Sequence, residues 1–179
     1  MTATAATSPF TTALEVPRWA LGFYLRHLPW IVGLSLLPAL ERVALLLWDD
    51  LPDGLGTLLE VLVWALRALL VVLIYRAAIS TDQRLRELDP RTRKARPESF
   101  LHTHRTAFAL QLGLFACGYV VFSIPEWAAA LVPTEHEHLY LAVVLAAKNP
   151  TVIAFYMIWV VGVVRQMLLT PTPDEHAAE

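Results

Sequence analysis

The sequence predicts an all-α integral membrane protein with four transmembrane helices arranged as two hairpins, both termini in the cytoplasm and a short N-terminal interfacial helix. Three observations predict this class. The chain is 56% hydrophobic and 17% charged over 179 residues, whereas a soluble domain is about 45–50% apolar and about 25% charged. Its apolar residues gather in runs long enough to cross about 30 Å of bilayer hydrocarbon. Its basic residues concentrate in one connection between two of these runs.

Four segments predict membrane spans, at about 28–48, 58–79, 106–124 and 151–169. The first contains Pro38, and the third is expected to end at Pro125. The apolar stretch 139–147 is too short to span alone and is followed by Pro150, which removes a backbone donor. We interpret this stretch as an interfacial or re-entrant helix, or as the first half of one kinked helix.

The two ends of the chain predict cytoplasmic tails. Residues 1–16 are rich in Thr and Ala and predict a disordered tail, since they have no basic segment followed by an apolar run as in a signal peptide. Residues 17–27 predict a short basic helix in the headgroup layer or an extension of the first span. Residues 170–179 predict a second tail, which leaves 17–169 as a single transmembrane domain.

A short repeat precedes the first and third spans. Phe23 and His27 lead into the first span, and Phe100 and His104 lead into the third at the same spacing. Two parallel helical hairpins that arose by duplication would produce this pattern.

The distribution of charge predicts the orientation. The connection at 80–105 is basic, whereas the loops expected on the opposite side are acidic, with Asp53 in one and Glu126 in the other. Connections rich in Arg and Lys stay in the cytoplasm, so both termini are expected inside. Most of the basic residues are arginine in an Ala/Leu/Val-rich background, as in proteins of high-GC bacteria. The expected location is therefore the plasma (inner) membrane of a bacterium.

Four charged residues are expected inside or next to the first two spans: Glu41, Arg42, Glu60 and Arg67. Arg67 lies ten residues past Thr57, about 15 Å into its span, where an unpaired arginine costs roughly 2.5–3.5 kcal/mol. We predict an ion pair between Glu41 and Arg67, with Arg42 and Glu60 extending the network. Glu60 also fits a capping box begun by Thr57. The pair is interpreted as structural, and the alternative is a polar pathway for an ion or substrate.

The stretch VPTEHEHLY at 132–140 has the highest density of metal-ligand residue types. Thr134 followed by Glu137 predicts a capping box at a helix start, and on a helix His136 and His138 point to different faces. We therefore predict a helix start and no bound metal or other cofactor. The alternative is a metal or proton-sensing site formed by Glu135, His136 and His138.

The basic connection predicts contact with anionic lipid headgroups on the cytoplasmic side. Residues 82–105 hold seven basic and four acidic side chains but one aromatic residue, Phe100. They therefore lack the stacking platform of a single-strand binder, and no nucleic acid is expected. The residues expected at the headgroups are Arg84, Arg86, Arg91, Arg93, Lys94 and Arg96.

The sequence contains no nucleotide-binding loop, Ser/His/Asp arrangement or zinc-protease helix motif. The single cysteine, Cys117, excludes an intrachain disulfide. The expected function is a non-catalytic accessory, assembly or regulatory subunit of a larger membrane complex, and the expected partner is a larger membrane protein or further copies of the chain. One alternative is a small oligomeric transporter or channel that uses Glu41 and Arg67. Another is a membrane enzyme that acts on lipid headgroups.

Overall fold

The computed structural model describes residues 8–47, 54–80 and 82–172, and every regular element in these ranges is helical. Four helical segments are long and apolar enough to cross a membrane: Leu28–Leu46, Leu55–Ser80, Arg105–Leu131 and Thr134–Leu169. The predicted all-helical class and its four apolar spans are therefore confirmed. Residues 1–7, the acidic stretch 48–53 and residues 173–179, on which parts of the expected tails and of the first loop fall, lie outside the described residues.

The first helix, α1 (Pro9–Arg26), is longer than predicted. The Ser8 hydroxyl caps it by accepting from the amide of Thr11 at 3.2 Å, and Pro9 occupies the first turn, where its missing N–H costs nothing. The buried residues are Ala13, Val16, Ala20 and Phe23, whose spacing of three and four residues marks one face of a helix. The expectation that the N-terminal tail extends to residue 16 is therefore wrong for residues 9–16.

Helices α2 (Leu28–Leu47) and α3 (Leu55–Tyr75) form the first two spans, and α3 continues into a π-helical turn, η1 (Arg76–Ser80). Pro38 lies inside α2. Helix α3 begins three residues before the expected start, after Gly54, whose φ of 85° favours glycine. Thr57 and Glu60 consequently lie within the helix, so the capping box predicted for them is wrong.

The basic connection is itself helical and contains α4 (Gln83–Arg86) and α5 (Pro90–Thr103). The carboxylates of Asp82 and Asp89 cap these helices by accepting from backbone amides of the first turns. Hydrogen bonds from the amides of Arg91 and Thr92 and from the Thr92 hydroxyl lower the pKa of Asp89 below its usual value.

Helix α6 (Arg105–Trp127) forms the third span and passes into a 3₁₀ turn, η2 (Ala128–Leu131). Pro125 does not close the helix as expected but lies in its last turn. Its carbonyl, which is close to the helix end, accepts a hydrogen bond from the hydroxyl of Tyr140 at 2.9 Å. The helix end is therefore stabilised by a side chain from the following helix.

The fourth span is one continuous helical segment made of α7 (Thr134–Lys148), η3 (Asn149–Ile153) and α8 (Ala154–Leu169). The expected start at Thr151 is therefore wrong, and of the interpretations of 139–147 the structure fits the first half of one long helix. A π-helical turn at η3 accommodates Pro150, because the wider turn absorbs the irregularity without ending the helix.

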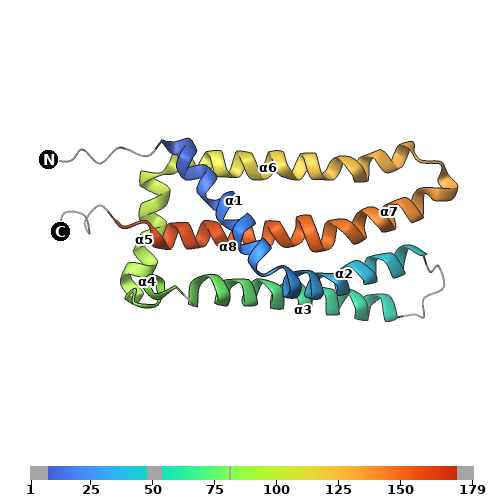
Figure 1. Ribbon diagram of the computed structural model, residues 1–179, viewed down its shortest axis with the longest axis horizontal. Coiled ribbons are helices and arrows are strands. Elements are labelled where there is room, and N and C mark those ends of the chain that lie inside the picture. Colours follow the sequence, from blue (N-terminus) through green and yellow to red (C-terminus); the bar gives the residue numbers. More distant parts are fainter. Residues whose placement is uncertain (1–7, 48–53, 81, 173–179) are drawn as a thin grey trace.

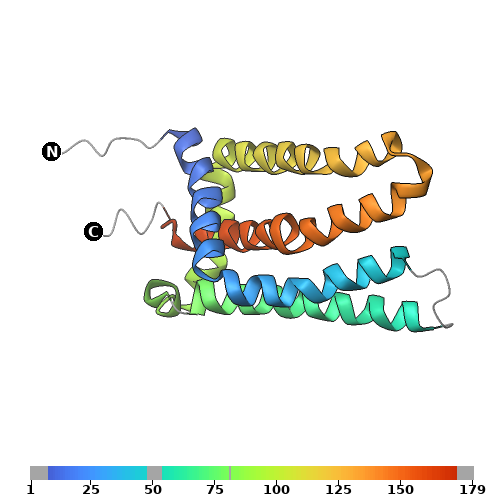
Figure 2. The ribbon, with the colours of Figure 1, turned by 45° about the vertical axis from the view of Figure 1, so that its right-hand side comes forward.

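The long helices run side by side, while α1 and α5 lie across one end of the bundle (Figure 1). Figure 2 shows α1 running steeply across the long helices at that end. Helix α8 is central there and packs against α1, α3 and α5, whereas α2 packs against α3 and α7. The core gathers at the same end, with Phe23, Ile31, Ile74 and Ile158 among its buried residues.

The repeat expected from the sequence has a structural counterpart at two helix junctions. His27 ends α1 and His104 ends α5, each with a φ of −112° and a backbone amide bonded to the carbonyl of the phenylalanine four residues earlier. The rings of Phe23 and His27 stack with centroids 4.2 Å apart, and those of Phe100 and His104 are 5.1 Å apart. Both pairs form the bend between a crossing helix and a span.

Candidate functional site

Polar side chains from three helices meet near the midpoint of the second span. Ser35 of α2, Arg67 of α3 and Asn149 of η3 line a cavity of about 10 Å³. Arg67 Nη2 donates to Asn149 Oδ1 at 3.4 Å, and the guanidinium carbon lies 5.7 Å from the centroid of the Trp64 ring. The Arg67 Nε and Ser35 Oγ atoms are buried without a hydrogen-bond partner. The cavity volume corresponds to about one water molecule.

The π-helical turn places Asn149 in this cluster. Asn149 Nδ2 and Thr151 Oγ1 each donate to the carbonyl four residues earlier, at 3.0 and 2.6 Å. The hydroxyl of Tyr24, from α1, donates to the carbonyl of Pro150 at 3.0 Å. These side chains satisfy carbonyls around the irregular turn, as backbone at membrane depth requires. The Asn149 Oδ1 atom remains directed at Arg67.

Glu41 lies on α2 with a side chain that is 4% exposed. It forms an ion pair with Arg42, whose Nε is 3.6 Å from Oε2, which is longer than the 2.7–3.2 Å of a hydrogen bond. Neither carboxylate oxygen has a hydrogen-bond partner. The structure contradicts the direct ion pair predicted between Glu41 and Arg67, since Arg67 points to Asn149.

Glu60, the fourth charge of the expected network, is exposed on α3 and forms no ion pair with the described residues. Glu60 lies in the second turn of α3, seven residues before Arg67. A rise of about 10 Å along the helix therefore separates the two residues. The four charges are therefore not joined by direct ion pairs into one network. Glu41 and Arg42 form one ion pair, and Arg67, which interacts electrostatically with both, hydrogen-bonds to Asn149 instead.

Glu41 opens onto an apolar groove between α2 and α3. The groove has a volume of about 520 Å³, and Glu41 is its one charged lining residue within the part of the chain that the structure describes. The other lining residues are aliphatic: Leu37, Leu40, Val43, Ala44, Leu55, Leu59, Leu62, Val63 and Leu66. The one acidic side chain that lines this hydrocarbon groove thus keeps both of its oxygens buried and without hydrogen-bond donors.

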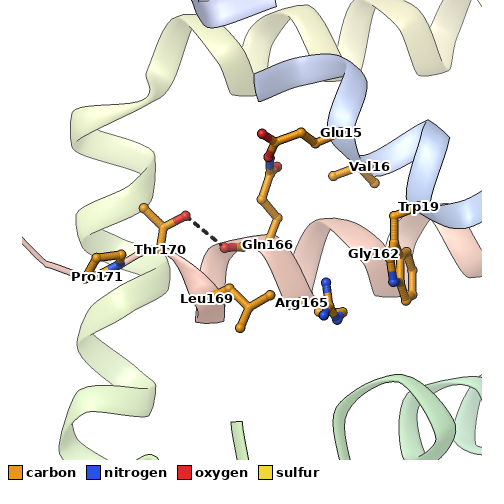
Figure 3. A pocket seen from close by; sticks show the side chains of 9 residues that line it. All are labelled: Glu15, Val16, Trp19, Gly162, Arg165, Gln166, Leu169, Thr170 and Pro171. Atoms are coloured by element: carbon orange, nitrogen blue, oxygen red, sulfur yellow. Dashed lines mark hydrogen bonds between the residues drawn. The ribbon is translucent and has the colours of Figure 1, made fainter. Parts of the chain in front are cut away.

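A second polar cluster lies at the end of the bundle crossed by α1 (Figure 3). Gln166 of α8 points toward α1, where its Nε2 donates to the carbonyl of Thr12 at 2.8 Å and to Glu15 Oε2 at 3.1 Å. Its Oε1 accepts from Gln111 of α6 at 2.5 Å. One buried glutamine therefore connects α1, α6 and α8.

Arg165, the residue before Gln166 on α8, lines the same pocket as Gln166. Its Nη2 forms a 2.8 Å ion pair with Asp82, and its guanidinium carbon lies 5.3 Å from the centroid of the Trp19 ring. Glu15, Trp19, Arg165 and Gln166 line a pocket of about 310 Å³ between α1 and α8 (Figure 3). The Arg165 charge is therefore paired with Asp82, whereas, among the described residues, the exposed Glu15 accepts only from the uncharged amide of Gln166.

The His/Glu stretch begins α7 as predicted, at Thr134. The helix has no side-chain cap, however, so the predicted capping box is wrong: Pro133 holds the cap position, and Glu135 and Glu137 lie in the first turn, where they favour the positive end of the helix dipole. His136 Nε2 lies 3.5 Å from Glu135 Oε1, and both side chains are mostly exposed. Among the described residues, no three His, Cys, Asp or Glu side chains gather closely enough to hold a metal ion.

The basic residues expected at the headgroups lie on α4 and α5. Arg96 differs from the others, since it is half-buried and Nη1 donates to the carbonyl of Leu168 at 2.6 Å, which fastens α5 to the end of α8. Arg93 donates to the Tyr75 hydroxyl at 3.3 Å. The residues with exposed side chains are Arg84, Arg86, Arg91, Arg93 and Lys94.

Sequence reasoning missed Gln111, Asn149 and Gln166. Each is an uncharged amide within a span, and each hydrogen-bonds to a different helix. The sequence does contain a signal for these contacts, namely an amide residue within an apolar run. Such side chains hydrogen-bond between helices within a membrane.

Comparisons with known proteins add no assignment. No family model, curated protein or solved structure matches this chain.

Proposed function

We propose that this chain is a non-catalytic accessory, assembly or regulatory subunit of a larger membrane complex in the bacterial plasma membrane. The observation that carries the proposal is the exposure of the spans. In each of Leu55–Ser80 and Arg105–Leu131, only 17% of the residues in an apolar 18-residue stretch of the span are buried within the chain. Such faces are available to lipid and to other membrane helices, whereas the main cluster of buried apolar residues gathers around α8.

The interior gives less support to the transporter or channel alternative. A transport pathway requires a continuous polar route, but the cavity beside Arg67 measures about 10 Å³ and corresponds to about one water molecule. Glu41 lines an apolar groove and not this cavity. The intramembrane charges therefore do not line one path.

The outer His/Glu stretch gives little support to an enzyme that acts on lipid headgroups. His136 and Glu135 are exposed neighbours at a helix start, and no described pocket contains them. A catalytic pair requires a third group that orients it and a site for the reacting atoms.

The proposed orientation places α1, α4 and α5 at the cytoplasmic face. The start of α1 and the end of α8 lie at the same end as α4 and α5 (Figure 1). The exposed arginines of α4 and α5 support this orientation and contact with anionic headgroups.

Purification from the native host tests the proposal. A tagged chain extracted in mild detergent is expected to carry one larger membrane polypeptide at a constant molar ratio, measured by quantitative mass spectrometry. A tagged four-span protein of unrelated sequence, expressed at the same level, controls for adventitious association. Recovery of the chain alone, or only with copies of itself, would contradict the proposal.

A further inference from the structure

The groove between α2 and α3 contains a charge that lipid cannot satisfy. Both oxygens of Glu41 are buried and lack hydrogen-bond donors, and the Arg42 Nε is 3.6 Å away. Acyl chains have no donors, and a buried carboxylate without donors is costly. An occupant that supplies a donor at this position would therefore bind more favourably than lipid.

The depth of Glu41 restricts what this occupant can be. Glu41 lies six residues before Leu47, the end of α2, so it is about 9 Å inside the helix end. Headgroup amines lie at the membrane surface, whereas a transmembrane helix can place a side chain at any depth. Charged side chains inside membranes pair with one another.

The shape and surface of the groove fit a helix. Its α3 side extends from Leu55 to Leu66, which is about 16 Å or three helical turns. Leu40 and Leu62, on opposite walls, are 61% and 51% exposed and present aliphatic side chains for packing. The walls thus offer an apolar surface about three turns long with one acceptor in it.

We propose that this groove binds a transmembrane helix of a partner protein that carries a lysine or arginine at the depth of Glu41. This inference rests on the proposed function as a subunit and names the chemistry by which the partner is recognised. The Glu41 carboxylate, whose oxygens are buried in the free chain, turns into the groove and accepts from the basic side chain, while aliphatic residues of the partner helix pack along α2 and α3. Arg42, whose side chain is 43% exposed, is free to turn toward the headgroups when the partner binds.

A synthetic helix tests this recognition directly. The probe is a Leu/Ala transmembrane peptide with one lysine about 9 Å from one end, and the comparison peptide has leucine at that position. Binding to the labelled full chain in liposomes is measured by energy transfer. The lysine peptide is expected to bind at least about tenfold more tightly, because hydrogen bonds to charged groups are strong. Equal affinities for the two peptides would overturn the proposal, and this comparison requires no variant of the chain.

Two variants assign the effect to Glu41. Glu41→Gln keeps the shape of the side chain and is expected to abolish the preference for lysine while it leaves binding of the leucine peptide unchanged. Glu60→Gln removes an exposed carboxylate of the same helix pair and is expected to keep the preference. A preference that survives in Glu41→Gln would overturn the proposal. Energy transfer between copies of the chain that the lysine peptide cannot displace from the groove, seen as no binding of the peptide, would also overturn it, since a second copy would then fill the groove.

The native complex separates this inference from the proposed function. A partner that co-purifies equally with wild type and with Glu41→Gln would leave the subunit function standing and overturn the groove proposal. A partner recovered with wild type and lost from Glu41→Gln, but not from Glu60→Gln, would support both.

Discussion

Gln166 is expected to be the polar residue on which the docking of α1 depends most. Its amide makes three hydrogen bonds: it accepts from Gln111 and donates to the Thr12 carbonyl and to Glu15. Replacing it with Met keeps the approximate volume and the helix propensity. It also leaves the Gln111 amide, which is 1% exposed, without its acceptor.

The expected cost follows from these contacts. Glu15 is exposed, so water replaces that bond, and the two remaining bonds contribute about 0.5–1.5 kcal/mol each. The unsatisfied Gln111 amide adds about 1–3 kcal/mol. Gln166→Met is therefore expected to lower the free energy of unfolding by about 2–6 kcal/mol. Gln111→Met is expected to cost less, because Gln166 still donates to Thr12.

The double variant provides the critical comparison. Without Gln111 there is no stranded amide, so Gln111→Met with Gln166→Met is expected to be more stable than Gln166→Met alone. Unfolding is measured in detergent by circular dichroism, and Gln83→Met, at an exposed residue of α4, serves as the control. Additive losses in the double variant would refute the reasoning, since independent residues give additive effects.

Two further predictions concern the cytoplasmic end as proposed above. A Cβ at Gly162 would lie 2.8 Å from the Trp19 ring and 2.9 Å from Val16, so Gly162→Val is expected to cost about 1–3 kcal/mol of unfolding free energy by overpacking. Gly33→Val is the control, because nothing lies within 4 Å of a Cβ at Gly33. Equal losses in the two variants would contradict the close approach of α1 to α8. Hydrogen bonds to the carboxylate lower the pKa of Asp89, which caps α5. The stabilisation by this cap is expected to be fully present above the unfolded pKa of about 3.9 and to be lost as the pH falls through the lower folded pKa. A titration midpoint above about 3.9 in the amide shifts of the first turn of α5 would contradict this expectation.

Hydropathy predicted the spans because membrane insertion imposes a length and a composition on each helix. It did not predict where the helices end. The sequence predicts a boundary at both Pro125 and Pro150, but each lies inside a helical segment. The Tyr140 hydroxyl bonds to the Pro125 carbonyl near the end of α6, and a π-helical turn accommodates Pro150. These solutions depend on tertiary contacts that the local sequence does not contain.

The candidate site was predictable only in part. Glu41 and Arg67 stand out as charges within apolar runs, and the structure buries Glu41. Their pairing was predicted from opposite charge and depth, yet Arg67 reaches Asn149 instead. Whether Arg67 reaches Glu41 or Asn149 depends on how α2, α3 and η3 are rotated about their axes. The hydropathy of one chain does not determine that rotation. The same limit concealed Gln166, which reads as the polar end of a span.

Cross-linking in the native membrane tests the central claim most directly. A photoreactive phenylalanine analogue is introduced at Leu62, which lines the groove and is 51% exposed, or at Val61, which is 62% exposed but does not line it. Irradiation of intact host cells is expected to give one discrete band, heavier than the 20.0 kDa chain by the mass of a single partner, from position 62 and not from position 61. The absence of a protein adduct at position 62, or equal adducts at both positions, would contradict a partner helix in the groove.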